Sequence, residues 1–314
     1  MPNARPHRPP RARLRSALLA TLLLPLALRA QTVPDAESYP SRCGTGAPAS
    51  ERGGYVPLPR GDVFCPLLAD PKGIRSFVTY QRGDASDFAQ DIVAVGIADQ
   101  FAFFRAGGSR AGDGVQLGVA GAVFAQFDLG APSDDLLNAD YLIALPLTFR
   151  RGAFSGRARL YHQSSHLGDE FILRPDHPER ENLSFESAEL LLSQDAGPLR
   201  VYAGGEYFFH RDPVALADGL LHGGVELRQR TGARFGTIAR ARLVAAADLK
   251  VVNDSSWRTG VNVRAGFEVG RPSEAGTASR RWSLLAEYYD GPSPYGQFHQ
   301  SHVRLTGIGF HFTL

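Results

Sequence analysis

Residues 261–269 read Val-Asn-Val-Arg-Ala-Gly-Phe-Glu-Val, with an apolar side chain at every odd position and mostly polar residues between them. Successive side chains of a β-strand point to opposite faces, so this stretch predicts a strand with one apolar and one polar face. The same period of two recurs at residues 115–129, 141–149, 201–209 and 282–288. The chain is therefore expected to be all-β from residue 75 onward.

Twelve strands are predicted in this part of the chain. They lie near residues 75–82, 91–105, 115–129, 139–150, 154–165, 182–194, 199–210, 219–230, 236–252, 257–270, 280–290 and 302–314. An even number of strands of about ten residues is typical of single-chain bacterial outer-membrane barrels. Short connections at 151–153 and 195–198 alternate with longer ones, as they do between the two ends of such a barrel. The sequence predicts a twelve-stranded antiparallel transmembrane β-barrel over residues 75–314.

The polar face of these strands carries charges of both signs. A secreted β-sandwich would also alternate, but its charged residues would be solvated. An apolar outer face and a charged inner face instead favour a barrel filled with Arg–Glu pairs. The whole chain holds 34 Lys and Arg against 32 Asp and Glu, a balance that argues against nucleic acid as a partner. The inner set comprises Arg157, Arg159, Glu189, Glu206, Glu226, Arg228, Arg240, Arg242, Arg264, Glu268 and Glu287.

The N-terminus predicts export to the outer membrane. Five arginines precede an apolar run at residues 17–28, which is typical of a signal peptide covering residues 1–30. Residues 31–74 contain seven prolines and are expected to form an extended periplasmic leader outside the barrel. Cys43 and Cys65 are the only cysteines, and an oxidising compartment favours a disulfide between them.

One strand departs from the apolar pattern on its outer face. The strand over residues 154–165 keeps its apolar side chains on even positions and arginines on odd ones, so His162 and Ser164 fall on the lipid face. In the next strand Glu186 shares a face with Leu190. A histidine can act as the base for a serine hydroxyl, and a carboxylate can orient that histidine. The alternative interpretation is a polar girdle at the membrane interface with no chemistry.

The segment Tyr161-His162-Gln163-Ser164-Ser165 resembles the H-x-S-N core of the outer-membrane phospholipase A family. The resemblance covers residues 161–169 and 184–190. It implies a twelve-stranded barrel that hydrolyses phospholipid acyl esters at the outer leaflet, with calcium as cofactor and a homodimer as the active form. His162 and Ser164 then match the family's base and nucleophile. Glu186 stands where the family has Asn, and Asp169 resembles its calcium-site carboxylate.

The longer run at residues 162–170, His-Gln-Ser-Ser-His-Leu-Gly-Asp-Glu, is similar to an exported barrel family of unassigned function. The chain is identified as a member of that family and as a relative of the phospholipases. The expected function is a serine acyl hydrolase acting on outer-membrane lipids through a Ser–His–Glu triad. A narrow channel or transporter, or a structural or adhesive barrel, remains the alternative. His210 and the other scattered histidines are interpreted as interfacial or lumen residues.

Overall fold

The computed structural model describes residues 54–85, 89–108, 112–175, 179–229, 232–235, 239–254, 257–270 and 281–313. The signal peptide predicted over residues 1–30 and most of the predicted leader lie outside the described residues. Within these ranges the chain contains no helix that could span a membrane.

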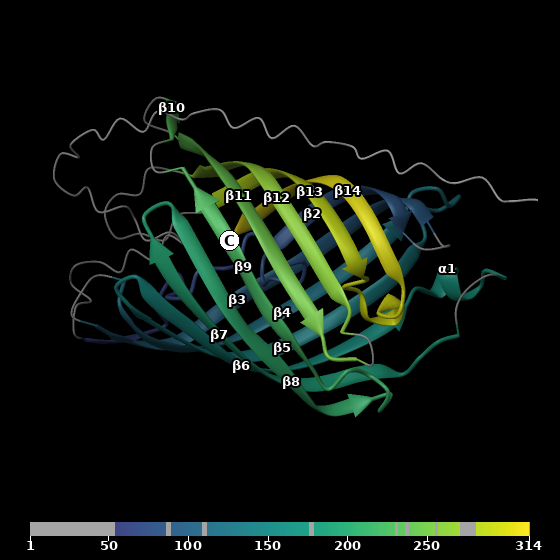
Figure 1. Ribbon diagram of the computed structural model, residues 1–314, viewed down its shortest axis with the longest axis horizontal. Coiled ribbons are helices and arrows are strands. Elements are labelled where there is room, and N and C mark those ends of the chain that lie inside the picture. Colours follow the sequence, from purple (N-terminus) through teal and green to yellow (C-terminus); the bar gives the residue numbers. More distant parts are fainter. Residues whose placement is uncertain are drawn as a thin grey trace, which may run out of the picture. The chain divides into compact units, whose positions relative to one another are not determined.

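Twelve long antiparallel strands form a closed β-barrel (Figure 1), which confirms the predicted fold. Each strand pairs with the next long strand along the chain, and β14 pairs with β2, so the sheet closes on itself. The strands are β2 (Ser76–Ala85), β3 (Ala89–Gly107), β4 (Gly114–Asp128), β5 (Leu136–Arg151), β6 (Phe154–Leu167), β7 (Leu183–Ala196), β8 (Leu199–Asp212), β9 (Gly219–Arg228), β11 (Ala239–Val252), β12 (Thr259–Gly270), β13 (Arg281–Pro292) and β14 (His302–Thr313).

Four short elements were not predicted. β1 (Tyr55–Pro57) adds to the end of β3, and β10 (Ala233–Phe235) pairs with β11. The helix α1 (Asp169–Ile172) lies in the β6–β7 connection, and the 3-10 turn η3 (Gly296–Phe298) lies in the β13–β14 connection. These two connections and those joining β8 to β9 and β11 to β12 all lie at the end of the barrel that we call the loop end.

The opposite end of the barrel holds the tight turns that the sequence predicts. β5 ends at Arg151 and β6 begins at Phe154, while β7 and β8 are joined as closely. Gly152 and Gly197 stand in these turns with φ of 61° and 57°, a backbone region that side chains with a Cβ rarely adopt. Glycine at these two positions allows the direct reversal of the chain.

The wall of the barrel has an apolar outside and a charged inside. Exposed large side chains such as Ile143, Leu160 and Leu190 occupy the outer positions of their strands. The inner positions bury charges that pair across neighbouring strands: Glu189 accepts hydrogen bonds from Arg157 Nε (2.7 Å) and Arg159 Nη2 (2.6 Å). Across neighbouring strands Arg242 likewise pairs with Glu268 and Arg264 with Glu287, whereas Arg228 pairs with Glu226 two residues earlier on β9. The predicted Arg–Glu filling is thus confirmed for these residues.

A segment of the leader occupies the lumen. Residues 62–75, which we call the plug segment, include Val63, Phe64 and Leu67 among the most buried side chains of the chain. The Phe64 ring lies beneath the guanidinium groups of Arg157 and Arg200, with 5.1 and 4.7 Å to the ring centroid. The expectation that the leader lies outside the barrel is therefore wrong for this segment.

The backbone of the plug segment is bound by inward-facing side chains from around the wall. Arg150 Nε donates to the carbonyl of Val63 (2.7 Å), and Arg200 Nη1 donates to that of Cys65 (3.0 Å). Asn262 Nδ2 donates to the carbonyl of Ala69 (2.8 Å). Buried backbone groups outside regular structure need such partners, and inward-facing polar side chains supply them here. Ion pairs add to this, joining Lys250 to Asp70 and Lys72 to Asp140.

Cys65 is buried in the lumen. Its predicted partner Cys43 lies outside the described residues, so the disulfide stays a prediction. If the bond forms, it ties the chain preceding the barrel to the plug segment inside it.

Loss of the Glu226 carboxylate should destabilise the barrel strongly. Glu226 Oε1 accepts from the Leu68 amide (2.6 Å), and Oε2 accepts from Arg200 (3.3 Å) and Arg228 (2.5 Å). Glu226→Ala leaves two guanidinium groups buried without this partner, so we expect a loss of about 3–5 kcal/mol. Guanidinium-dependent unfolding from lipid vesicles, followed by tryptophan fluorescence, measures it. Glu170→Ala, at an exposed position, is the control, and equal stability of the two variants would contradict the role of the plug contacts.

Candidate active site

The outer face of β6 and β7 carries a polar cluster near the loop end. Their register places His162 opposite Glu186 and Ser164 opposite Ser184. Opposite side chains of an antiparallel pair lie on one face, with Cβ atoms about 4.5–5.5 Å apart. His162 Nδ1 accordingly lies 2.8 Å from Glu186 Oε1. Both side chains are partly exposed on the side of the wall that carries Leu160 and Leu190.

A second imidazole joins the same carboxylate. His210 Nδ1 lies 2.7 Å from Glu186 Oε2, because His210 pairs with Glu186 between β7 and β8. Strict alternation along β8, with Tyr207 and Phe209 outside, places His210 on the inner face. A register shift between Glu186 and Ser187 brings it outside instead. The sequence carries no clear signal for this irregularity, and alternation alone therefore does not bring His210 to the site.

Ser164 lies two residues beyond His162 on the same face and is partly exposed. Side chains at i and i+2 of a strand have Cα atoms about 6–7 Å apart. In the described part of the chain no hydrogen bond joins Ser164 to His162. The structure thus brings His162 and Glu186 into contact and leaves Ser164 partly exposed beside them.

The contact with Glu186 fixes which nitrogen of the His162 ring carries the proton. An ionised carboxylate can only accept hydrogen bonds, so Nδ1 carries the proton that faces Glu186. Nε2 is then the nitrogen with the free lone pair, which is the form required of a general base. Glu186 would also stabilise the imidazolium formed when Nε2 takes a proton.

The inner face of the same motif anchors the loop end of the barrel. Ser165 Oγ donates to Asp140, and it accepts from the Gln297 amide (3.0 Å) of η3. The Gln297 side chain returns a hydrogen bond to the Ser165 carbonyl (2.8 Å). Residues 162–170 therefore divide by face: inward side chains hold the β13–β14 connection, and outward side chains remain available for chemistry.

Asp169 is the first residue of α1 and is exposed. Phe171 of the same helix is buried against Phe298, with 5.8 Å between ring centroids. Calcium takes six to eight oxygen ligands. Among the described residues Asp169 belongs to no group of three or more carboxylate or imidazole ligands.

Two clusters of side chains that could bind a metal ion do occur among the described residues, but they lie inside the barrel. Asp70, His222 and Asp248 form one, and Glu189, Glu206 and His222 form the other. Several of these carboxylates already pair with cations: Asp70 with Lys250, and Glu189 with two arginines. These groups belong to the ion-pair network of the lumen.

Comparison with known proteins supports the fold. A family model described as "Protein of unknown function (DUF1207)" matches residues 28–314. No curated protein matches the chain. An active-site mutant of outer membrane phospholipase A from Escherichia coli has a TM-score of 0.50 at 13% identity, covering 79% of this chain and 93% of that chain.

Two further solved structures are similar. The outer membrane phospholipase of Salmonella typhi, a dimer with bound calcium, has a TM-score of 0.49 at 15% identity and covers 76% of this chain and 90% of that chain. The KdgM porin has a TM-score of 0.43 at 9% identity, covering 77% and 99%. At these identities the likeness concerns the fold alone. The fold is that of Gram-negative outer-membrane proteins, and the protein is an outer-membrane β-barrel.

Gly168 is expected to be essential for the geometry of this site. A Cβ at Gly168 would lie 1.8 Å from the carbonyl oxygen of Leu136, so Gly168→Ala must displace the end of β6 from β5. We expect a loss of about 1–3 kcal/mol in the free energy of unfolding, measured in lipid vesicles. Gly121→Ala is the matched control, because its Cβ would meet only one atom, at 4.0 Å. Equal effects of the two substitutions would contradict the close approach.

Proposed function

We propose that this chain, which belongs to the DUF1207 family, hydrolyses acyl esters of outer-membrane lipids with Ser164 as nucleophile. The observation that carries the proposal is the 2.8 Å contact between His162 Nδ1 and Glu186 Oε1, beside Ser164 on the outer face of the barrel. A base oriented by a carboxylate next to a serine is the arrangement that nucleophilic acyl transfer requires.

The reaction proceeds in two halves. Ser164 Oγ attacks the ester carbonyl carbon while His162 Nε2 takes the hydroxyl proton. The bond to the leaving alcohol breaks, and the imidazolium returns its proton to the alcohol oxygen. Water then attacks the acyl-serine with the same assistance from His162, releasing a carboxylic acid and restoring the Ser164 hydroxyl. Glu186 stabilises the imidazolium in both halves.

His210 acts as a positioning residue for Glu186. A lone carboxylate on a strand surface has several rotamers, and a hydrogen bond from His210 to Oε2 restrains them while Oε1 faces His162. Substitutions of His210 and Glu186 should therefore be non-additive, since both act through the same carboxylate.

The surroundings fit a lipid substrate. Tyr141 and Ile143 of β5, and Leu160 and Leu190 along β6 and β7, are exposed on the same side of the wall. A phospholipid packed against these side chains brings its ester groups to the depth of the membrane interface, where the polar cluster lies near the strand ends. This placement needs no pocket, because the bilayer itself delivers the substrate.

Calcium and a homodimer remain proposals that rest on the resemblance to the phospholipases. Asp169 is the residue proposed to bind calcium, and no reaction step is derived through it. Hydrolysis measured with calcium and with a chelator tests the ion, and cross-linking in the membrane tests the dimer.

The channel hypothesis is disfavoured by the plug segment. Its backbone and side chains occupy the lumen, where Arg150 and Arg200 bind its carbonyls and Arg228 pairs with Glu226. We expect no stepwise ion conductance from the reconstituted protein in planar bilayers. Steady conductance steps above those of protein-free bilayers would favour the channel.

Substitutions in the cluster test the hydrolase. Ser164→Ala should lower phospholipid hydrolysis at least about a thousandfold and His162→Ala at least about a hundredfold, because they remove the nucleophile and its base. Glu186→Gln should cost less, since an amide oxygen still accepts from the imidazole. His210→Ala should cost least. The assay is fatty-acid release from phospholipid vesicles holding the refolded protein.

A serine-directed fluorophosphonate provides an independent readout. It should label Ser164 in the wild type and fail to label the His162→Ala protein. Ser184→Ala, across the strand pair, is the matched control and should retain both labelling and activity. Undiminished hydrolysis by Ser164→Ala would remove the enzyme proposal.

A further inference from the structure

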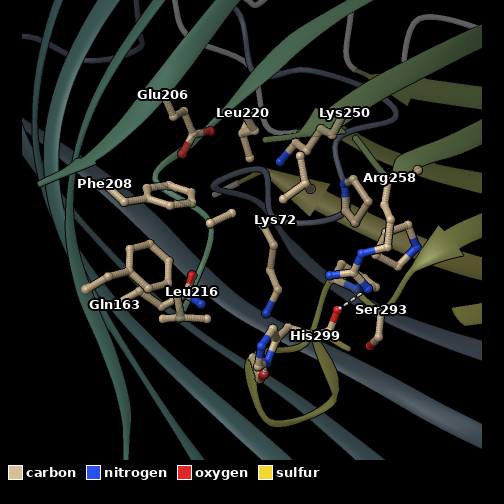
Figure 2. A pocket seen from close by; sticks show the side chains of 18 of the residues that line it. Lys72, Gln163, Glu206, Phe208, Leu216, Leu220, Lys250, Arg258, Ser293 and His299 are labelled. Carbon is tan, nitrogen blue, oxygen red and sulfur yellow. Dashed lines mark hydrogen bonds between the residues drawn. The ribbon is translucent and has the colours of Figure 1, made fainter. Parts of the chain in front are cut away.

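The lumen contains a cavity of about 450 Å³ toward the loop end (Figure 2). Its lining includes Pro71 and Lys72 of the plug segment and residues from the β8–β9, β11–β12 and β13–β14 connections. The volume is in the range of small-molecule sites. It is separate from the polar cluster of the outer face: Tyr161, Gln163 and Phe185 line the cavity, whereas their chain neighbours His162 and Glu186 face outward.

One part of the cavity wall is apolar. Phe185 of β7 and Phe208 of β8 lie close together, with 4.7 Å between their ring centroids. Leu142, Leu216 and Leu220 extend the same lining. In Figure 2, Phe208 and Leu216 lie on one side of the cavity and Arg258 on the other, with Lys72 and Lys250 reaching in between them.

The charged part of the wall is asymmetric, because its cations are more exposed than their partners. The Lys250 side chain is 23% exposed and that of Asp70, its partner, only 2%. Lys72 is 11% exposed and its partner Asp140 is fully buried. Arg258 is 32% exposed.

The other charged groups of the cavity wall do not reverse this excess of exposed positive charge. Asp254, the partner of Arg258, is 19% exposed. Glu206 and Asp248 also line the cavity, but both are buried and accept tyrosine hydroxyl hydrogen bonds. Arg159 also lines the cavity; its Nη2 pairs with Glu189, while its Nε and Nη1 have no acceptor among the described residues.

We propose that this cavity binds a single-chain amphipathic anion, such as a medium-chain carboxylate. The apolar chain lies against Phe185, Phe208 and the leucines, and the carboxylate faces Lys250 and Arg258. A small cation would meet mainly ammonium and guanidinium groups. A fully polar solute would lose its hydration against the aromatic rings without gaining hydrogen bonds there. The ligand enters from the loop end, where three connections border the cavity.

The test measures binding of octanoate to the full-length protein in lipid nanodiscs. Equilibrium dialysis with radiolabelled octanoate, corrected with empty nanodiscs, gives the dissociation constant. Octanoate should bind at least tenfold more tightly than octylammonium or butyrate, which lack the negative charge and the long chain respectively. Octylammonium or butyrate binding as tightly as octanoate would overturn the proposal.

Variants locate the site. Arg258→Gln should weaken octanoate binding at least threefold. The triple variant that adds Lys250→Met and Asp70→Asn should weaken octanoate binding at least tenfold. The paired substitution removes both members of an ion pair, so no buried charge is left alone. Ala217→Trp, which fills the cavity from the β8–β9 connection, should abolish binding.

Two controls separate this cavity from the proposed reaction. Arg180→Gln removes an exposed arginine that is not part of the lining and should leave binding unchanged. Ser164→Ala should also bind octanoate as the wild type does, because the ligand is added directly and needs no hydrolysis. Wild-type affinity in the Arg258, Lys250 and Asp70 triple variant, with the barrel intact by heat-dependent gel mobility, would refute the assignment.

Discussion

The inward-facing arginines impose the constraint on which the rest of this barrel depends. A buried guanidinium group is costly unless its charge is paired and its donors are bonded. Neighbouring strands supply glutamates such as Glu189 to Arg157 and Glu226 to Arg200, while the plug segment supplies carbonyls to Arg150 and Arg200. The wall and the plug are therefore one network. The segment that precedes β2 is as much a part of the interior as the strands.

This network explains why the two faces of β6 can serve different purposes. On the inner face Arg157, Arg159 and Ser165 are bonded to β7, β5 and η3, and they hold the strand in register. Because the register is held from inside, the outer face is free to carry His162 and Ser164 at positions where apolar residues would suit the bilayer better. The His162–Glu186 contact then follows from the pairing of β6 with β7.

In the described part of the chain the interior is neither empty nor uniformly filled. The plug segment closes the middle of the lumen, and above it the loop-end connections enclose a cavity with an apolar and a cationic side. An outer-face site that meets lipid and an inner cavity suited to an amphipathic anion lie on opposite sides of the same two strands. Either can be altered by substitution without touching the other, so the two proposals are experimentally independent.

The period of two in the sequence is sufficient to predict the twelve strands, the faces of His162, Ser164 and Glu186, and the charged interior. These properties depend only on the local geometry of a strand, in which alternate side chains share a face. The place of residues 62–75 inside the barrel follows from the folded structure alone, because a proline-rich segment has no periodicity and its position depends on distant arginines. The same holds for His210, whose position depends on a register shift between two strands, and for the cavity, whose walls come from segments far apart in the chain.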